Sequence, residues 1–297
     1  MKVVKKRVVI LSHVFLGLGS LVMLYPLVFA VLGQFLSIEG FYEVGILPVP
    51  EGLGYYFDNL FTILRRTEIY KSILLTLARF VWYAFILSVT SVFGGYAFAK
   101  VNFKCKNVAF YILMSSMMVP GVALLIPQYQ MLMRFPLVGG NDILGRGGQG
   151  FGGNVAVLFI TGCFSAYNIF LVRQALVGIG NEYKEAAEID GAGFIRIVIS
   201  IYMPMLKPVL AVIIIQTFIG QWNDYLFPVM FLSGSQNLWP IGVLSVKIQS
   251  DYLYTAGLMN YPMVMLIGVF MMIPPIVVYI VFQKSFVEGM TVGGVKA

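Results

Sequence analysis

The chain has 297 residues, of which 59% are hydrophobic and only 11% are charged. Soluble domains contain roughly one quarter charged residues, so this composition excludes an ordinary soluble protein and predicts an integral membrane protein. The formal net charge of +7 fits basic segments that flank membrane spans and attract anionic lipid headgroups, and it shows no pattern of nucleic-acid binding.

Six hydrophobic segments are long enough to cross a membrane. A helix needs about 20 residues to span a hydrocarbon core of about 30 Å. We therefore expect an all-α, polytopic protein with six transmembrane helices, the first of which is retained because no convincing small-residue cleavage site follows it. The six segments lie at about 8–36, 72–99, 107–133, 154–178, 205–232 and 258–283.

Basic residues indicate the orientation of these spans. Lys and Arg residues are enriched on the cytoplasmic side of membrane proteins, and most of those in this chain lie on the side of the N-terminus if the six spans alternate. We therefore expect both termini in the cytoplasm. Arg65, Arg66 and Lys71 oppose this orientation, because they fall in the first outer segment.

Arg79 is an ionisable residue within the second predicted span. A charge inside a membrane is costly, so such a residue needs either a partner or a route to water. Arg79 lies about two helical turns from the outer end of its span. We interpret its side chain as extending outward to the membrane surface, in preference to contacting a substrate.

A charged segment, residues 181–204, separates the fourth and fifth spans. Asn181 is expected to cap a short helix, within which Lys184 and Glu188 have the spacing of an ion pair. Gly191 is expected to end this helix in the left-handed conformation. On these residues alone, a capped surface helix with nothing docked on it is an equally good interpretation.

A polar and aromatic stretch interrupts the fifth span. It consists of Gln221, Trp222, Asn223, Asp224 and Tyr225. Polar groups at this depth need an aqueous cavity or helix partners, and aromatic faces beside amide and carboxylate groups suit the C–H faces and hydroxyls of sugars. We predict that these five residues line a substrate pathway, with Asn223 and Asp224 as the best candidates. The alternative is an aromatic belt at headgroup depth formed by Trp222 and Tyr225.

Catalytic and metal-binding patterns are not found in the sequence. His13 is its only histidine, which excludes zinc motifs built on two histidines. A Gly-x-x-x-x-Gly-Lys-Ser/Thr motif for nucleotide binding is also missing, and the glycine-rich segment 139–153 lacks the required ending. We therefore expect no catalytic residues, no bound cofactor and no metal site in this chain.

The pattern from Glu185 to Pro204 is Glu-Ala-Ala, three residues, Gly, nine residues, Ile, two residues and Pro. This pattern resembles the cytoplasmic coupling loop of bacterial ABC importer permeases. Three further segments are similar to the second permease subunit of carbohydrate importers, the maltose-type group. They are residues 96–100, 220–228 and 286–297, and the resemblance runs from about Lys71 to Ala297.

The resemblance implies a type I ABC importer permease fold. It implies an N-terminal span with an external loop at 1–70, and a core permease domain at 71–297 that includes the coupling loop at 181–204. The C-terminal tail, with Gly293, Gly294 and Lys296, is implied to reach towards an ATPase. The residues implied to couple this chain to the ATPase are Glu185, Ala186, Ala187, Asp190, Gly191 and Pro204.

The implied function is ATP-driven, binding-protein-dependent import of a sugar or oligosaccharide across the bacterial cytoplasmic (inner) membrane. The implied partners are a second homologous permease, two ATPase subunits that bind ATP and Mg²⁺, and an external solute-binding protein. Glycerol phosphate or a polyol derivative is the alternative substrate. An ion-coupled secondary transporter and an intramembrane enzyme are less favoured, because we see neither inverted repeats nor paired catalytic groups.

Overall fold

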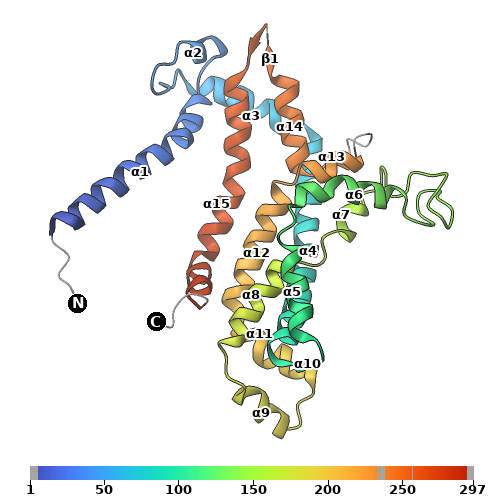
Figure 1. Cartoon of the computed structure of the whole chain (residues 1–297). Helices are drawn as coiled ribbons and strands as arrows, with labels where there is room; N and C mark the ends of the chain where they lie inside the picture. Colours follow the sequence, from blue (N-terminus) through green and yellow to red (C-terminus); the bar gives the residue numbers. More distant parts are fainter. Residues whose placement is uncertain (1–5, 233, 235–237, 256, 293–297) are drawn as a thin grey trace. The chain divides into compact units, whose positions relative to one another are not determined.

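The computed structural model describes residues 6–232, 234, 238–255 and 257–292, and it is helical as expected (Figure 1). One short hairpin pairs Tyr254 with Met259 and Thr255 with Leu258. The elements in chain order are α1 (Lys6–Gly33), α2 (Ile38–Tyr42), α3 (Leu53–Leu64), α4 (Thr67–Lys100), α5 (Lys106–Ser116), α6 (Gly121–Met133), α7 (Val157–Ile160), α8 (Ala166–Val177), α9 (Glu182–Ile189), α10 (Phe194–Arg196), the π-helix η1 (Ile197–Tyr202), α11 (Met203–Met205), α12 (Lys207–Trp222), α13 (Leu226–Leu232), α14 (Ile241–Tyr252), β1 (Tyr254–Thr255), β2 (Leu258–Met259) and α15 (Tyr261–Val292).

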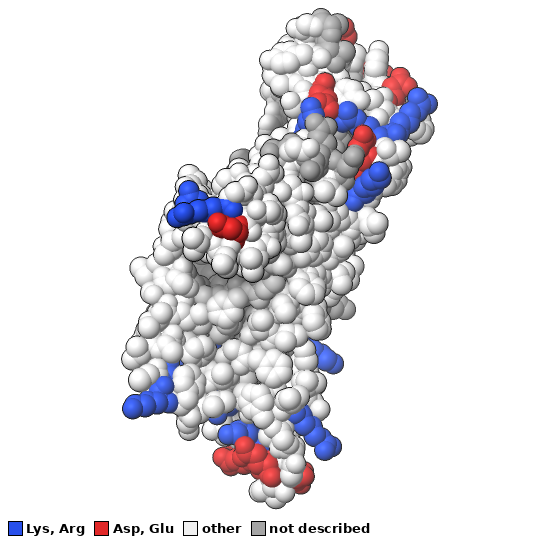
Figure 2. Space-filling view, turned by 90° about the vertical axis from the view of Figure 1, so that its right-hand side faces the viewer, with Lys and Arg blue, Asp and Glu red and all other residues white. Residues whose placement is uncertain are grey.

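Three helical segments in the described residues are long and apolar enough to cross a membrane. They are Val8–Gly33, Thr67–Lys100 and Tyr261–Gln283. Two bent pairs could each form one more span: α5 with α6, bent by 95°, and Phe194–Met205 with α12, bent by 80°. Their apolar side chains are largely exposed, and Figure 2 shows wide areas of surface without charge. The polytopic all-α fold is thus confirmed, with three to five candidate spans in the described chain.

The number of spans differs from the six expected, because residues 154–178 do not form one long helix. α7 ends at Ile160, Thr161 is extended, and Gly162 has a φ of +78° in the left-handed region. α8 starts anew at Ser165, whose hydroxyl accepts a 3.3 Å hydrogen bond from the N–H of Asn168. A left-handed residue ends a right-handed helix, and apolar composition alone does not reveal it.

The chain divides into two compact units. The first contains residues 1–69 and 245–274, and the second contains residues 70–244 and 275–297. The first unit therefore joins two segments that are far apart in the sequence. The expected division into 1–70 and 71–297 stays a prediction.

Aromatic and ionic contacts join the two segments of the first unit. The ring of Phe41 stacks on that of Tyr261 at 4.9 Å, and the hydroxyl of Tyr42 accepts a 2.9 Å hydrogen bond from the N–H of Met259. Arg66 pairs with Asp251 at 2.9 Å, and Lys247 contacts the same carboxylate from one helical turn away.

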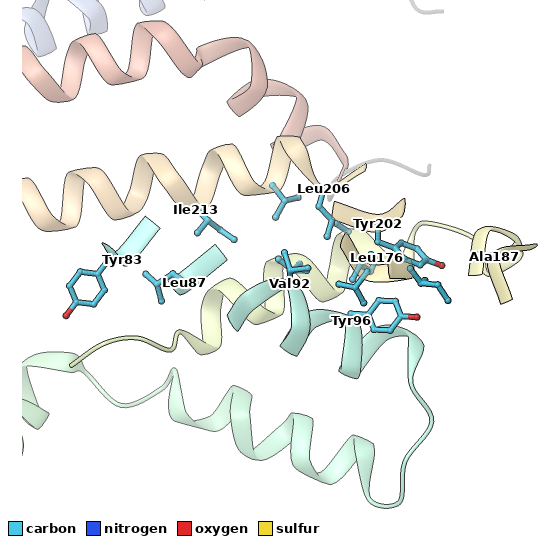
Figure 3. Close-up of a cluster of buried hydrophobic side chains, with 14 residues drawn as sticks. Tyr83, Leu87, Val92, Tyr96, Leu176, Ala187, Tyr202, Leu206 and Ile213 are labelled. Carbon is cyan, nitrogen blue, oxygen red and sulfur yellow. The ribbon is translucent and has the colours of Figure 1, made fainter. Parts of the chain in front are cut away.

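The second unit has a hydrophobic core between α4, α8 and α12 (Figure 3). Gly94 and Gly95 let α4 approach α8 closely: a Cβ on Gly95 would lie 2.5 Å from the side chain of Val172. Figure 3 shows this core continuing to Ala187 of α9. Its labelled members are Tyr83, Leu87, Val92, Tyr96, Leu176, Ala187, Tyr202, Leu206 and Ile213.

Asp251 makes the stability of the first unit depend on pH. Partial burial raises its pKa, but hydrogen bonds and charges from Lys247 and Arg66 outweigh this and hold the pKa of Asp251 below its usual value. A carboxyl group whose pKa is lowered by folding stabilises the folded state above its unfolded pKa. This stabilisation is lost as the pH falls through the folded pKa.

We expect Asp251→Asn to lower the melting temperature of the purified chain at pH 7. The loss should be about 1 kcal/mol or less, because the ion pair is partly exposed. The difference from the parent chain should shrink below about pH 4. Thermal unfolding in detergent between pH 3 and 7 measures this, with Asp58→Asn at an exposed position of α3 as the control. Equal melting temperatures at pH 7 would contradict the role of this pair.

Candidate functional site

α9 lies at one end of the second unit, between α8 and α10 (Figure 1). Lys184 pairs with Glu188 at 3.5 Å, as their spacing predicted. Ala187 faces the core and is 7% exposed, whereas Ala186 is exposed and Ile189 is 87% exposed. The helix therefore attaches to the rest of the unit by one side and presents its other side outward.

The end of α9 is a Schellman motif. Gly191 has a φ of +75°, which confirms the left-handed conformation expected from the sequence. Its N–H donates to the carbonyl of Glu188 at 3.1 Å, and the N–H of Ala192 donates to the carbonyl of Ala187 at 2.8 Å. These two bonds satisfy carbonyls at the helix end and fix the direction in which the chain leaves.

The start of α9 differs from the expected side-chain cap. Asn181 has helical backbone angles, whereas a capping residue is typically extended, so its side chain does not cap. Its Oδ1 instead accepts a 2.8 Å hydrogen bond from Nζ of Lys100, the last residue of α4. The same Nζ donates to the carbonyl of Ile179 and lies 5.8 Å from the ring centre of Tyr202. Lys100 therefore holds the segment that leads into α9.

Aromatic packing holds the segment that leaves α9. The buried rings of Tyr96 and Tyr202 meet at 5.4 Å, and Phe194 lies edge-on to Tyr96 at 5.4 Å (Figure 3 shows the two tyrosines). Pro204 lies in α11, just before the bend into α12. Because proline has no N–H, it cannot donate to the carbonyl one turn earlier, and this accompanies the wider π-helical turn of η1.

The predicted coupling residues therefore occupy different environments. Four of them are exposed on α9 or directly after it: Glu185, Ala186, Asp190 and Gly191. Ala187 is buried on the side of α9 that faces the core. Pro204 is exposed on a separate helix. The tail residues Gly293, Gly294 and Lys296 lie outside the described residues. The coupling roles of all these residues stay predictions.

The second predicted site lies where α12 meets α13. Trp222 ends α12 and is buried, with its ring stacked on Phe218 at 5.6 Å. Asn223 and Tyr225 are exposed, and Asp224 lies between them. Gln221 is half-buried, and its Oε1 has no hydrogen-bond partner in the described structure. The structure thus places these residues at one break between helices, and their role as a pathway stays a prediction.

Arg79 also belongs to this site, and the sequence interpretation missed this contact. Its Nη2 donates to Oδ2 of Asp224 at 2.6 Å, so the expectation that Arg79 extends outward to the membrane surface was wrong. The Arg79 side chain is 3% exposed and the Asp224 side chain 23%. Two further guanidinium atoms, Nε and Nη1, are buried without a partner in the described chain.

Gly242 lets the start of α14 pack closely against the backbone of Asp224, the acidic partner in this ion pair. A Cβ on Gly242 would lie 2.5 Å from the carbonyl oxygen of Asp224, so no side chain fits there. The N–H of Ile241 donates to the hydroxyl of Thr76 at 2.9 Å, one turn before Arg79 on α4. Within the described residues, no group of three or more His, Cys, Asp and Glu side chains could hold a metal.

Breaking the Arg79–Asp224 pair should destabilise the second unit. Arg79→Gln leaves a carboxylate without its cation, and Asp224→Asn leaves a buried cation, so each should cost about 3 kcal/mol. The double variant should cost less than the sum of the two single variants. Thermal unfolding of all four proteins in detergent measures the coupling. Strictly additive losses would show that the two groups do not interact.

Lys100→Met should loosen the start of α9, because two hydrogen bonds to the preceding segment are lost. We expect the backbone N–H groups of residues 181–186 to exchange with deuterium several-fold faster, while the rest of the core is unchanged. Lys104→Met is the matched control, because Lys104 is an exposed lysine of the adjacent loop. Unchanged exchange in Lys100→Met would refute the anchoring role.

Comparisons with known proteins agree with this architecture. Residues 91–292 match the family described as binding-protein-dependent transport system inner membrane component. The chain is 26% identical to the arabinooligosaccharides transport system permease protein AraQ of Halalkalibacterium halodurans, covering 93% of this chain and 92% of the relative. It is 27% identical to the melibiose/raffinose/stachyose import permease protein MelC of Bacillus subtilis, covering 81% of each.

Two further similarities extend over nearly the whole chain. The sn-glycerol-3-phosphate transport system permease protein UgpE of Yersinia pestis is 27% identical, covering 95% of each chain. A chain from a bacterial ABC transporter involved in the import of the acidic polysaccharide alginate has the same fold, with a TM-score of 0.72 at 24% identity, covering 96% of this chain and 99% of that one.

The family match covers more than half of the chain, and it implies an ATPase and a solute-binding protein as partners. The chain therefore belongs to the family of inner membrane components of binding-protein-dependent transport systems, and it is a permease subunit with the type I ABC importer fold.

Proposed function

We propose that this permease forms one half of the translocation path of an importer that brings a sugar or short oligosaccharide into the cytoplasm. A second, homologous permease forms the other half, and two ATPase subunits drive the transport. Two of the relatives above are named for oligosaccharides and one for sn-glycerol-3-phosphate. Glycerol phosphate or a polyol derivative is therefore the second candidate substrate.

The observation that carries this proposal is the outward face of α9. Ile189 is a large apolar side chain that is 87% exposed at the end of the unit, where it suits a protein partner better than water. Ala186 beside it is small enough for a partner to approach closely, and Glu185 and Asp190 surround them with charge. This mixture supports docking of α9 in a groove of the ATPase.

The packing of α9 suggests how a movement would be transmitted. α9 is tied to α4 through Lys100 and continues through η1 and α11 into α12. Arg79 lies on α4, about 30 Å from Lys100 at 1.5 Å per residue, and its partner Asp224 lies two residues after the end of α12. Nucleotide-dependent closure of the ATPases would thus reach the break between α12 and α13 through two helices.

Basic residues support a cytoplasmic position for α9, and the cytoplasmic position of both termini stays a prediction from the sequence. Lys100, Lys104 and Lys106 lie at the end of α4 and the start of α5, which is the same end of the unit as α9. Figure 2 shows acidic and basic side chains gathered at this end, with a largely uncharged surface next to it. This distribution is the one that the positive-inside rule expects at a cytoplasmic face.

Gly191→Val should abolish coupling, because a β-branched residue strains the left-handed cap that ends α9. Gly193→Val is the matched control. A Cβ meets open space at both positions, but Gly193 has a φ of −71°, which any residue adopts. We expect Gly191→Val to insert normally and to lose ATP-driven uptake in reconstituted liposomes, and Gly193→Val to retain most of it. Equal uptake by the two variants would refute the role of this cap.

Uptake by the reconstituted importer also tests the substrate. The chain is combined with its cognate permease, ATPase and binding protein, and ATP-dependent accumulation of labelled oligosaccharides and of sn-glycerol 3-phosphate is compared. We expect accumulation of an oligosaccharide. Accumulation of sn-glycerol 3-phosphate alone would favour the second candidate, and uptake driven by an ion gradient without ATP would overturn the proposal.

A further inference from the structure

A polar pocket of about 490 Å³ lies between the end of α4, the start of α5 and α8. Its polar lining comes from Asn102, Lys106, Asn107 and Arg173, and Phe103 borders it. The described residues that line the pocket include no Asp or Glu. It is separate from the break between α12 and α13 and from the outward face of α9.

Both cations of this pocket lack a counter-charge. Lys106 donates from Nζ to the carbonyls of Val101 at 2.8 Å and Ala99 at 3.4 Å, which lie at the C-terminal end of α4; this helix end offers only a partial negative charge, and Lys106 has no carboxylate partner among the described ion pairs. The guanidinium of Arg173 lies over the ring of Phe110 at 4.1 Å, and its Nε is buried without a hydrogen-bond partner in the described structure. Neither residue takes part in the ion pairs of the described chain. Two cations that share one pocket and have no carboxylate partner in the described chain favour an anionic ligand.

The backbone adds to this attraction. Lys106 and Asn107 are the first residues of α5, an 11-residue helix whose N-cap, Cys105, makes no side-chain capping bond. The first N–H groups of a helix have no partner within it, and the helix dipole is positive at this end. Cys105 itself has a φ of +62°, an uncommon conformation for a residue other than glycine. The N–H of Lys106 donates to the carbonyl of Phe103 at 3.3 Å, so the donors that the start of α5 presents beside the two cations are the N–H groups of Asn107 and Val108, which suit a phosphate.

An apolar surface continues from this pocket along α5. Val108, Tyr111 and Ile112 are spaced three and four residues apart on one side of the helix, and they are 58%, 72% and 66% exposed. A free phosphate ion would not contact this surface, whereas the acyl chains of a phospholipid could lie along it.

We propose that this pocket binds the phosphate headgroup of an anionic phospholipid of the cytoplasmic leaflet. The choice of leaflet rests on the proposed function, which places α9 and this end of the unit in the cytoplasm. Arg173 and Lys106 hold the phosphate, and Val108, Tyr111 and Ile112 contact the acyl chains. The bound lipid would bridge α8 to the loop between α4 and α5, next to the segment that leads into α9.

Lipid retention tests this site in the full-length chain. The protein is purified in neutral detergent, offered mixed micelles of phosphatidylglycerol or phosphatidylcholine, and the bound lipid is counted by native mass spectrometry. We expect selective retention of phosphatidylglycerol, and roughly fivefold weaker retention in Arg173→Gln and in Lys106→Gln, as each cation near a membrane surface contributes about this factor. Lys104→Gln is the control, because Lys104 is an exposed lysine outside the pocket lining.

Further measurements distinguish a phospholipid headgroup from a free phosphate ion as the ligand of this pocket. If inorganic phosphate at millimolar concentration displaces phosphatidylglycerol and protects the chain equally well against thermal unfolding, then the pocket is a site for a free anion and the lipid proposal is wrong. Equal retention in Arg173→Gln and Lys104→Gln would also overturn it. Should Arg173→Gln fail to fold, Lys106→Gln decides alone. Uptake by the importer in phosphatidylcholine liposomes tests the proposed function separately, because it does not require this lipid.

Discussion

α4 packs on α8 through Gly94 and Gly95, where a Cβ would lie 2.9 Å from the side chain of Ile169 and 2.5 Å from that of Val172, so neither position has room for a side chain of its own. A membrane offers little hydrophobic driving force between apolar helices, so close packing of small residues supplies the contact. The core on either side of these glycines depends on it, and so do the features at the end of α4. Lys100 can reach the segment before α9, and Arg173 can share a cavity with Lys106, only because α8 lies directly against α4.

The two ends of this packed pair have opposite chemistry. At one end, Lys100 uses neutral acceptors and an aromatic ring to hold the approach to α9. At the other, Arg79 meets the carboxylate of Asp224 and keeps two donors unpaired in the described structure. Removing either partner of this ion pair would leave a poorly solvated charge unpaired, which is costly, so the pair holds α4 to the break between α12 and α13.

Features that depend on near neighbours in the chain were predictable. The left-handed Gly191 and the pair of Lys184 with Glu188 follow from residues within one or two turns. Contacts across the fold were not: Asp224 lies 145 residues after Arg79, and no periodicity connects them. Asn181 has a typical capping side chain, yet Lys100 binds it instead. Residues 154–178 are predominantly apolar and long enough for a span, but the left-handed Gly162 divides them.

The distance in sequence between Arg79 and Asp224 has a consequence for biogenesis. Ribosomes add about 5–20 residues per second, so Arg79 is synthesised roughly 7–30 s before the carboxylate that neutralises it. An arginine at the centre of a nascent span costs about 2.5–3.5 kcal/mol during insertion, which is an upper limit for Arg79 at about two turns from the end of its span. The apolar residues of α4 must offset this free energy during insertion. The helix is 34 residues long with a mean hydropathy of 1.8, so its apolar side chains are numerous enough to do so. The length of α4 thus serves the order of synthesis as well as the folded state.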